Sequence, residues 1–186
     1  MAQGETRRAD AALLMQDLMS GKVKVGGDFT LTDSRGRRAG LSQYRGKWVL
    51  LYFGFTTCPD VCPTDLFEIG KAVRLLGADG EGVQPVFVTL DPERDRPAMI
   101  GEYVASFHPR FVALTGAPSE IATVAARYRV FYERVAIPGG LGYTIDHAAF
   151  TYVIRPDGNY HGILPPGTPA DRMTLVLRDA MAEPPP

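Results

Sequence analysis

Residues 48–63 read WVLLYFGFTTCPDVCP, and the order of elements in the rest of the chain is best understood from this segment. Trp48–Phe53 is continuously apolar and rich in β-forming residues, which is typical of a central strand covered on both faces. A turn with Cys58 and Cys62 follows, and Pro63 suits the first turn of a helix, where a missing N–H leaves no bond unmade. The segment therefore predicts a buried strand that passes through a cysteine turn into a helix.

Strand and helix patterns alternate on both sides of this segment. They predict a hairpin over Phe29–Leu41, strands over Val83–Leu90, Phe111–Thr115, Phe150–Arg155 and Tyr160–Leu164, and helices over Pro63–Leu76, Pro97–Phe107, Pro118–Tyr128 and Thr168–Met181, the last capped by Thr168. Such alternation forms a mostly parallel sheet, and the closing hairpin adds an antiparallel edge. We predict an α/β, thioredoxin-like fold: a central mixed sheet flanked by helices, with an extra N-terminal β-hairpin and an inserted strand and helix.

The composition is that of an ordinary globular domain. The chain has 186 residues, 45% hydrophobic and 22% charged, and its net charge of −1 offers nucleic acid no basic field. Its longest apolar run, Trp48–Phe55, is about eight residues, whereas a membrane-spanning helix needs about 20, so we expect no membrane anchor in this chain. We expect an N-terminal helical extension over residues 1–25, a single domain over 26–182 and a frayed tail over 183–186.

The chain has two cysteines, Cys58 and Cys62, placed four positions apart. At a helix N-terminus, unpaired N–H groups and the helix dipole stabilise a thiolate. If the turn is near-helical, the two residues share one face about 6 Å apart, close enough for a disulfide or for two sulfur ligands on one ion. Three intervening residues give a wider spacing than the Cys-x-x-Cys of redox thioredoxins, and thiolates select soft ions such as Cu(I). Two unrelated helix cysteines are the structural alternative.

Of the three histidines, His147 is the candidate third ligand. It precedes the strand predicted over Phe150–Arg155, and in thioredoxin-like chains the loop at this point packs against the cysteine turn. Asp146 is expected to orient the imidazole. A histidine with a purely structural place in the loop explains the spacing equally well. For His108, after a helix, and His161, in a hairpin strand, structural roles are sufficient explanations.

An acidic turn, Leu90–Asp95, closes the second central strand on the same edge of the sheet. The structural interpretation is that Asp95 caps the following helix and Arg94 pairs with a neighbouring carboxylate. The functional interpretation places Asp91 near the cysteine turn, as a hard ligand for an oxidised metal. We favour the structural role.

Three motifs together resemble the Sco/SenC family of copper-binding cytochrome c oxidase assembly factors. They are CPDVCP over residues 58–63, DPERD over 91–95 and YTIDHAAFTY over 143–152, and the likeness extends roughly over residues 26–181. Ala148 replaces a serine often found after the family's histidine, which changes a hydrogen bond but removes no ligand. The membrane anchor usual in the family is absent, so we expect either that it has been removed or that this member is soluble.

The resemblance implies a metallochaperone that binds one copper ion, Cu(I) or Cu(II), through Cys58, Cys62 and His147. It implies delivery of copper to, or reduction of thiols in, the dinuclear copper site of oxidase subunit II at the periplasmic, extracytoplasmic face of a bacterial membrane, with other copper chaperones as further partners. The enzymatic alternative is a thiol–disulfide reductase that uses Cys58 and Cys62 as a redox-active pair on the subunit II cysteines. This sequence has no suitably placed arginine for a peroxide-scavenging function, and it lacks the ligand spacing of a structural zinc module.

Overall fold

The computed structural model describes residues 16, 25–139 and 142–183. Its elements are β1 (Thr30–Asp33), β2 (Arg38–Gly40), η1 (Leu41–Tyr44), β3 (Trp48–Gly54), α2 (Val61–Leu75), η2 (Gly77–Gly82), β4 (Val83–Thr89), α3 (Pro97–Ala105), β5 (Val112–Thr115), α4 (Pro118–Arg127), β6 (Tyr132–Ala136), β7 (Tyr143–His147), β8 (Thr151–Ile154), β9 (Tyr160–Leu164) and α5 (Ala170–Ala182). All of the helical extension predicted over residues 1–25 except residues 16 and 25, and all of the predicted tail except residue 183, lie outside the described residues. In the described part of the chain, no helix combines the length and the hydropathy needed to cross a membrane.

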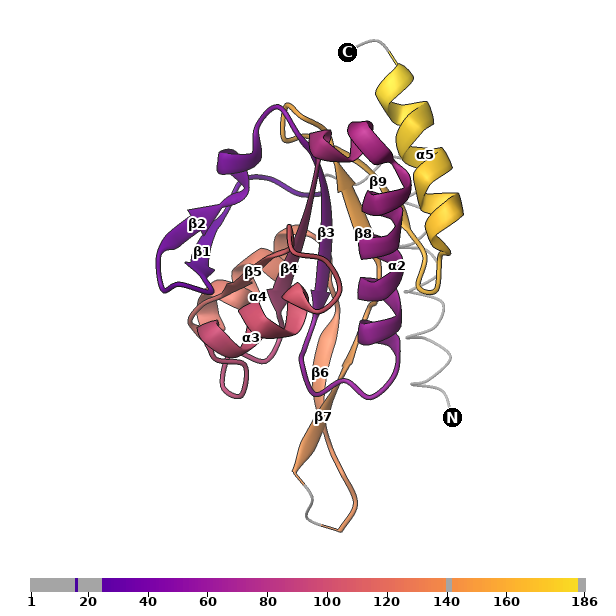
Figure 1. Ribbon diagram of the computed structural model, residues 1–186. Helices are drawn as coiled ribbons and strands as arrows, with labels where there is room; N and C mark the ends of the chain where they lie inside the picture. Colours follow the sequence, from indigo (N-terminus) through magenta and orange to yellow (C-terminus); the bar gives the residue numbers. More distant parts are fainter. Residues whose placement is uncertain (1–15, 17–24, 140–141, 184–186) are drawn as a thin grey trace.

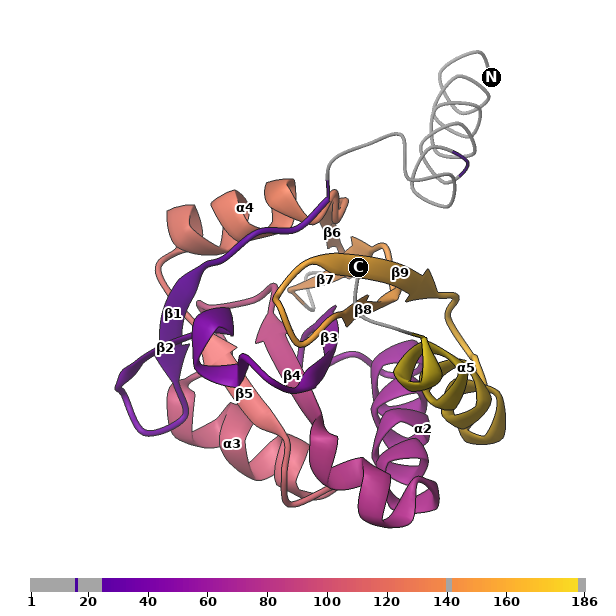
Figure 2. The same ribbon diagram turned by 90° about the horizontal axis from the view of Figure 1, so that it is seen from above.

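Seven strands form one mixed sheet in the order β2-β1-β5-β4-β3-β8-β9. Strands β3, β4 and β5 are parallel, whereas β8 is antiparallel to β3, and β1 is antiparallel to β5. Helices α2, α3 and α5 cover one face, and α4 covers the other (Figure 2). The predicted mixed sheet, its flanking helices and its N-terminal hairpin are confirmed.

The two central strands supply most of the core. All seven residues of β3 and all seven of β4 are buried, because helices cover the sheet on both faces at this point. Their parallel pairing brings both carboxyl ends to the same edge of the sheet. The cysteine turn that follows β3 and the acidic turn that follows β4 therefore lie side by side.

A second, two-stranded sheet, the antiparallel hairpin β6–β7, was not predicted. The sequence predicts that His147 lies in a loop; in the structure His147 is the last residue of β7. Four of the five β6 residues are exposed, so no buried stripe marks the strand in the sequence. Figure 1 shows the hairpin extending past the carboxyl end of β3, beside the turn that leads into α2.

Two predicted helix caps are wrong. Asp95 does not cap α3: its carboxylate accepts hydrogen bonds from the backbone N–H of Thr56 (3.0 Å) and from the hydroxyls of Thr56 (2.5 Å) and Thr89 (2.6 Å). Thr168 does not cap α5: its hydroxyl donates to the carbonyl of Pro165, and Pro169 is the N-cap. A short polar side chain before a helix suggests a cap, but both of these side chains form hydrogen bonds to other partners and none to an N–H group of the helix.

The close packing of α2 against β3 leaves no space for a side chain at Gly54, the last residue of β3. A Cβ at this position would lie 2.9 Å from the sulfur of Cys62 and 3.0 Å from the ring of Tyr52. We predict that Gly54→Ala lowers the free energy of unfolding by about 1–3 kcal/mol through overpacking. The matched control is Gly162→Ala in β9, where a Cβ meets nothing within 4 Å. Urea unfolding of both variants tests this, and equal stability of the two would contradict it.

Candidate metal centre

The two sulfurs occupy different environments in the turn between β3 and α2. Cys58 lies in the turn and is partly buried, and its N–H donates to the carbonyl of Phe55 (3.3 Å). Cys62 lies in the first turn of α2 and is fully buried, at 0% exposure. Both are free thiols in this structure. The helix begins at Val61 rather than at the predicted Pro63, so Cys62 already has helical geometry.

His147 reaches both sulfurs from the hairpin. Its Nε2 lies 3.4 Å from Sγ of Cys62, and the donor atoms of Cys58, Cys62 and His147 all lie within 4.8 Å of one another. The imidazole packs edge-on against the rings of Tyr52 and Phe55, at centroid distances of 6.5 and 5.8 Å. The structure thus brings together the three residues that the sequence singled out.

The thiols of the pair have opposite pKa shifts. The Cys62 thiol donates a hydrogen bond to Cys58; with further hydrogen bonds from His147 and two backbone N–H groups, this lowers the pKa of Cys58 to about 4 despite its partial burial. The pKa of Cys62 is raised, because the same hydrogen bond favours its protonated form and because the side chain is buried. At neutral pH the metal-free pair therefore consists of a Cys58 thiolate and a Cys62 thiol.

Sequence reasoning missed a buried polar pair beside Cys62. Tyr52, in β3, donates its hydroxyl to Asp65 (3.1 Å) and lies within hydrogen-bonding reach of the Cys62 sulfur. Asp65 is 1% exposed, and its other oxygen accepts from the N–H of Gly167 (2.7 Å). Burial raises the pKa of the Asp65 carboxyl. The available signal was an aspartate three residues after Cys62, a spacing that places both on one helix face.

Of the two carboxylates considered as supports for the site, Asp146 lies differently from the prediction and Asp91 takes the favoured structural role. Asp146 does not orient the imidazole: it is exposed and points to the opposite face of β7, and no described residue bonds Nδ1 of His147. Asp91 is fully buried but is not a ligand, because its oxygens are engaged by Arg94 and by the hydroxyl of Tyr143 (2.8 Å). The favoured structural role of Asp91, and the pairing of Arg94 with a carboxylate, agree with these contacts.

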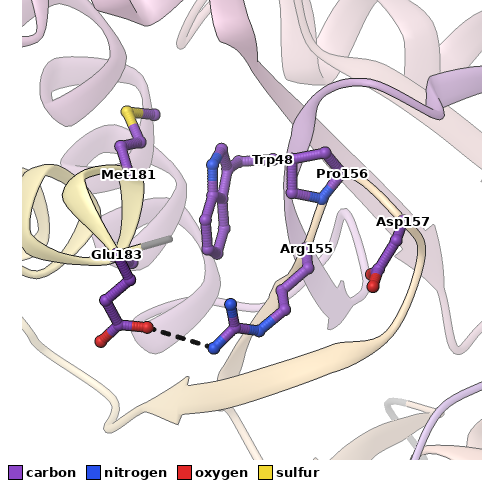
Figure 3. A pocket seen from close by; sticks show the side chains of 7 residues that line it. Trp48, Arg155, Pro156, Asp157, Met181 and Glu183 are labelled. Atoms are coloured by element: carbon purple, nitrogen blue, oxygen red, sulfur yellow. Dashed lines mark hydrogen bonds and ion pairs between the residues drawn. The ribbon is translucent and has the colours of Figure 1, made fainter. Parts of the chain in front are cut away.

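The remaining histidines lie elsewhere. Nδ1 of His108 accepts from the N–H of Arg110 (3.2 Å), and the ring of His161 packs edge-on against Trp48 at 5.2 Å. Trp48 also lines a cavity of about 230 Å³ at the opposite end of β3 from the sulfurs, where Arg155 pairs with Glu183 (3.2 Å; Figure 3). No cysteine or histidine is among the described residues that line this cavity, so it is separate from the candidate metal centre.

Two thiolates and an imidazole are a donor set suited to a soft or borderline ion, and thiolates in particular select Cu(I). Cys58 and His147 are partly exposed to solvent, whereas Cys62 is fully buried. The same two sulfurs are also placed to form a disulfide, and a disulfide no longer offers thiolate ligands. The centre can therefore hold a metal ion or undergo thiol–disulfide chemistry, but the two sulfurs cannot do both at once.

The lowered pKa of Cys58 predicts an unusual pH profile for its alkylation in the reduced, metal-free protein. Iodoacetamide should modify Cys58 at a rate that is nearly constant from pH 6 to 8 and falls only as the pH approaches about 4, because the thiolate persists down to its pKa. In urea-unfolded protein, the rate should rise about tenfold per pH unit below the ordinary thiol pKa. A tenfold rise per unit in the folded protein as well would contradict the assignment.

Comparison with known proteins agrees with this geometry. The family model described as SCO1/SenC matches residues 18–182. The chain is 43% identical over 158 residues to the mitochondrial protein SCO2 homolog of Bos taurus, covering 84% of this chain and 59% of that protein. It is 44% identical over 140 residues to the SCO2-like protein RP587 of Rickettsia prowazekii, covering 75% of this chain and 68% of that protein. The chain thus spans about three fifths to two thirds of these relatives.

Among solved structures, the fold is similar to that of Arabidopsis thaliana ScoI, determined with copper bound. The TM-score is 0.79 at 36% sequence identity, over 84% of this chain and 98% of that one. This likeness confirms the predicted thioredoxin-like class. From the match of the family model over most of its length, and from relatives above 40% identity, the chain belongs to the SCO1/SenC family.

Proposed function

We propose that this protein is a copper metallochaperone that binds one copper ion through Cys58, Cys62 and His147. The observation that carries the proposal is the approach of the three donor atoms to within 4.8 Å of one another, on two segments far apart in the sequence. Support comes from the copper-bound structure of the related Arabidopsis ScoI. The proposed process is cytochrome c oxidase assembly, with the dinuclear copper site of subunit II as the recipient, at the extracytoplasmic face of a bacterial membrane.

The arrangement of the ligands suits a carrier that must both hold and release its ion. Cys58 is already a thiolate, whereas Cys62 must lose its proton when copper binds, so uptake releases this proton. The partly exposed Cys58 side offers a recipient's thiolate or imidazole a route to the ion, and transfer then proceeds by exchange of one ligand at a time. Oxidation of the Cys58 thiolate and the Cys62 thiol to a disulfide removes two electrons and one proton, and it abolishes binding because a disulfide offers no thiolate ligand.

Copper titration of the reduced protein under anaerobic conditions tests the proposal. Wild-type protein should bind one ion per chain, and Cys58→Ser, Cys62→Ser or His147→Ala should each weaken binding by more than about 100-fold, above the usual cost of losing a mere supporting contact. His108→Ala and His161→Ala are the matched controls and should leave the affinity unchanged. Undiminished uptake by the double cysteine variant would refute the site.

A second candidate function, thiol–disulfide reduction, is favoured by the low pKa of the partly exposed Cys58 beside a second thiol. The Cys58 thiolate would attack a partner disulfide, forming a mixed disulfide and releasing one partner thiolate. Cys62, once deprotonated, would then attack the Cys58 sulfur, forming the Cys58–Cys62 disulfide and releasing the second partner thiol. Two electrons pass to the partner, and turnover needs an external thiol reductant.

The two functions differ in turnover, which gives a direct comparison. We predict that copper-loaded protein transfers its ion to an apo subunit II fragment, and that a serine at either cysteine abolishes this transfer because each sulfur supplies a ligand. With excess dithiol, reduction of oxidised subunit II should be slow. Rapid multiple-turnover reduction without any copper transfer would instead establish the reductase.

A further inference from the structure

The hairpin that carries His147 has almost no core of its own. In β6 no residue is fully buried, and in β7 only Ile145 is (4% exposed). Because side chains alternate along a strand, Tyr143, Ile145 and His147 lie on the same face of β7. Whatever fixes Tyr143 against the domain therefore also fixes the direction in which His147 points.

Tyr143 makes three contacts with two residues of the acidic turn. Its hydroxyl donates to Asp91 (2.8 Å), its carbonyl accepts from Nη1 of Arg94 (2.8 Å), and the Arg94 guanidinium lies 3.9 Å from the centre of its ring. Asp91 is fully buried and also pairs with Arg94, so the three groups form one closed set of contacts. The Arg134 guanidinium also lies near the Tyr143 ring, 4.8 Å from its centre, and it pairs with Glu93 (2.8 Å).

The other end of the acidic turn is attached to the cysteine turn. Asp95 is fully buried, and its carboxylate accepts both the N–H and the hydroxyl of Thr56, two residues before Cys58. A continuous set of polar contacts, with the buried Asp91 and Asp95 at its centre, thus runs from Thr56 through the acidic turn to Tyr143. Its two ends hold the segments that supply the sulfurs and the imidazole.

From these contacts we propose that Tyr143 is a positioning residue for the copper site, which keeps His147 within reach of the two sulfurs without touching the ion. The proposal rests on the copper-binding function proposed above. In the absence of the Tyr143 contacts, the hairpin moves away from the cysteine turn and the ion is left with its two sulfur ligands. Tyr143 thereby determines whether copper has two ligands or three.

Copper affinity and electron paramagnetic resonance of the Cu(II) form test this. Tyr143→Phe, which loses one hydrogen bond, should weaken binding about three- to tenfold. Tyr143→Ala should weaken it further and remove the nitrogen hyperfine signal of the imidazole. Tyr160→Phe is the matched control, because no described residue bonds its hydroxyl. In a His147→Ala background, Tyr143→Ala should cause no additional loss; the same loss with and without His147 would overturn the proposal.

Hydrogen exchange of the metal-free protein provides a readout that does not depend on copper. Tyr143→Ala should speed exchange of the amides in β6 and β7 while leaving those of β3 and β4 protected, and Tyr160→Phe should leave both sets unchanged. If the wild-type protein binds no copper, the proposed function fails, and faster hairpin exchange still shows that Tyr143 positions His147. Unchanged hairpin exchange in Tyr143→Ala refutes the positioning role whatever the copper result.

Discussion

The acidic turn, Leu90–Asp95, connects the two parts of the chain that supply the donor atoms. Asp95 accepts a hydrogen bond from Thr56 at the start of the cysteine turn, and Asp91 accepts one from Tyr143 in the hairpin β6–β7. Both side chains are fully buried, so loss of the partners of either one would leave a polar group that neither water nor the protein solvates, which would destabilise the fold. The turn can take this place because β3 and β4 are parallel neighbours and end at the same edge.

The three donor residues differ in how firmly the fold holds them. Cys62 is fixed by burial, by Gly54 beneath it and by Tyr52 beside it, and behaves as part of the core. Cys58 lies in the turn with a low pKa, and His147 comes from a hairpin held mainly by polar contacts. Transfer by exchange of one ligand at a time can begin at the accessible ligands and end at the buried sulfur, so this gradient in exposure matches the copper transfer proposed above.

The sequence was informative where a structural rule acts locally. The apolar run of β3 follows from cover on both faces, and the helix after the cysteines follows from proline placement, so both could be predicted. The hairpin could not, because β6 is mostly exposed and its strands are defined by pairing with each other. The same holds for Asp95, whose cap-like position is overridden by Thr56, 39 residues away. The nearness of His147 to Cys62, 85 residues apart, was predicted from the fold class and the family resemblance rather than from spacing.

We propose that the hairpin brings an imidazole to the two sulfurs so that all three bind one ion. X-ray absorption spectroscopy of the reduced, copper-loaded protein measures this coordination directly. We expect two sulfur scatterers and one nitrogen scatterer in the first coordination sphere, with the multiple-scattering pattern of an imidazole. Two sulfurs with no imidazole contribution, or a sphere of nitrogen and oxygen alone, would contradict it.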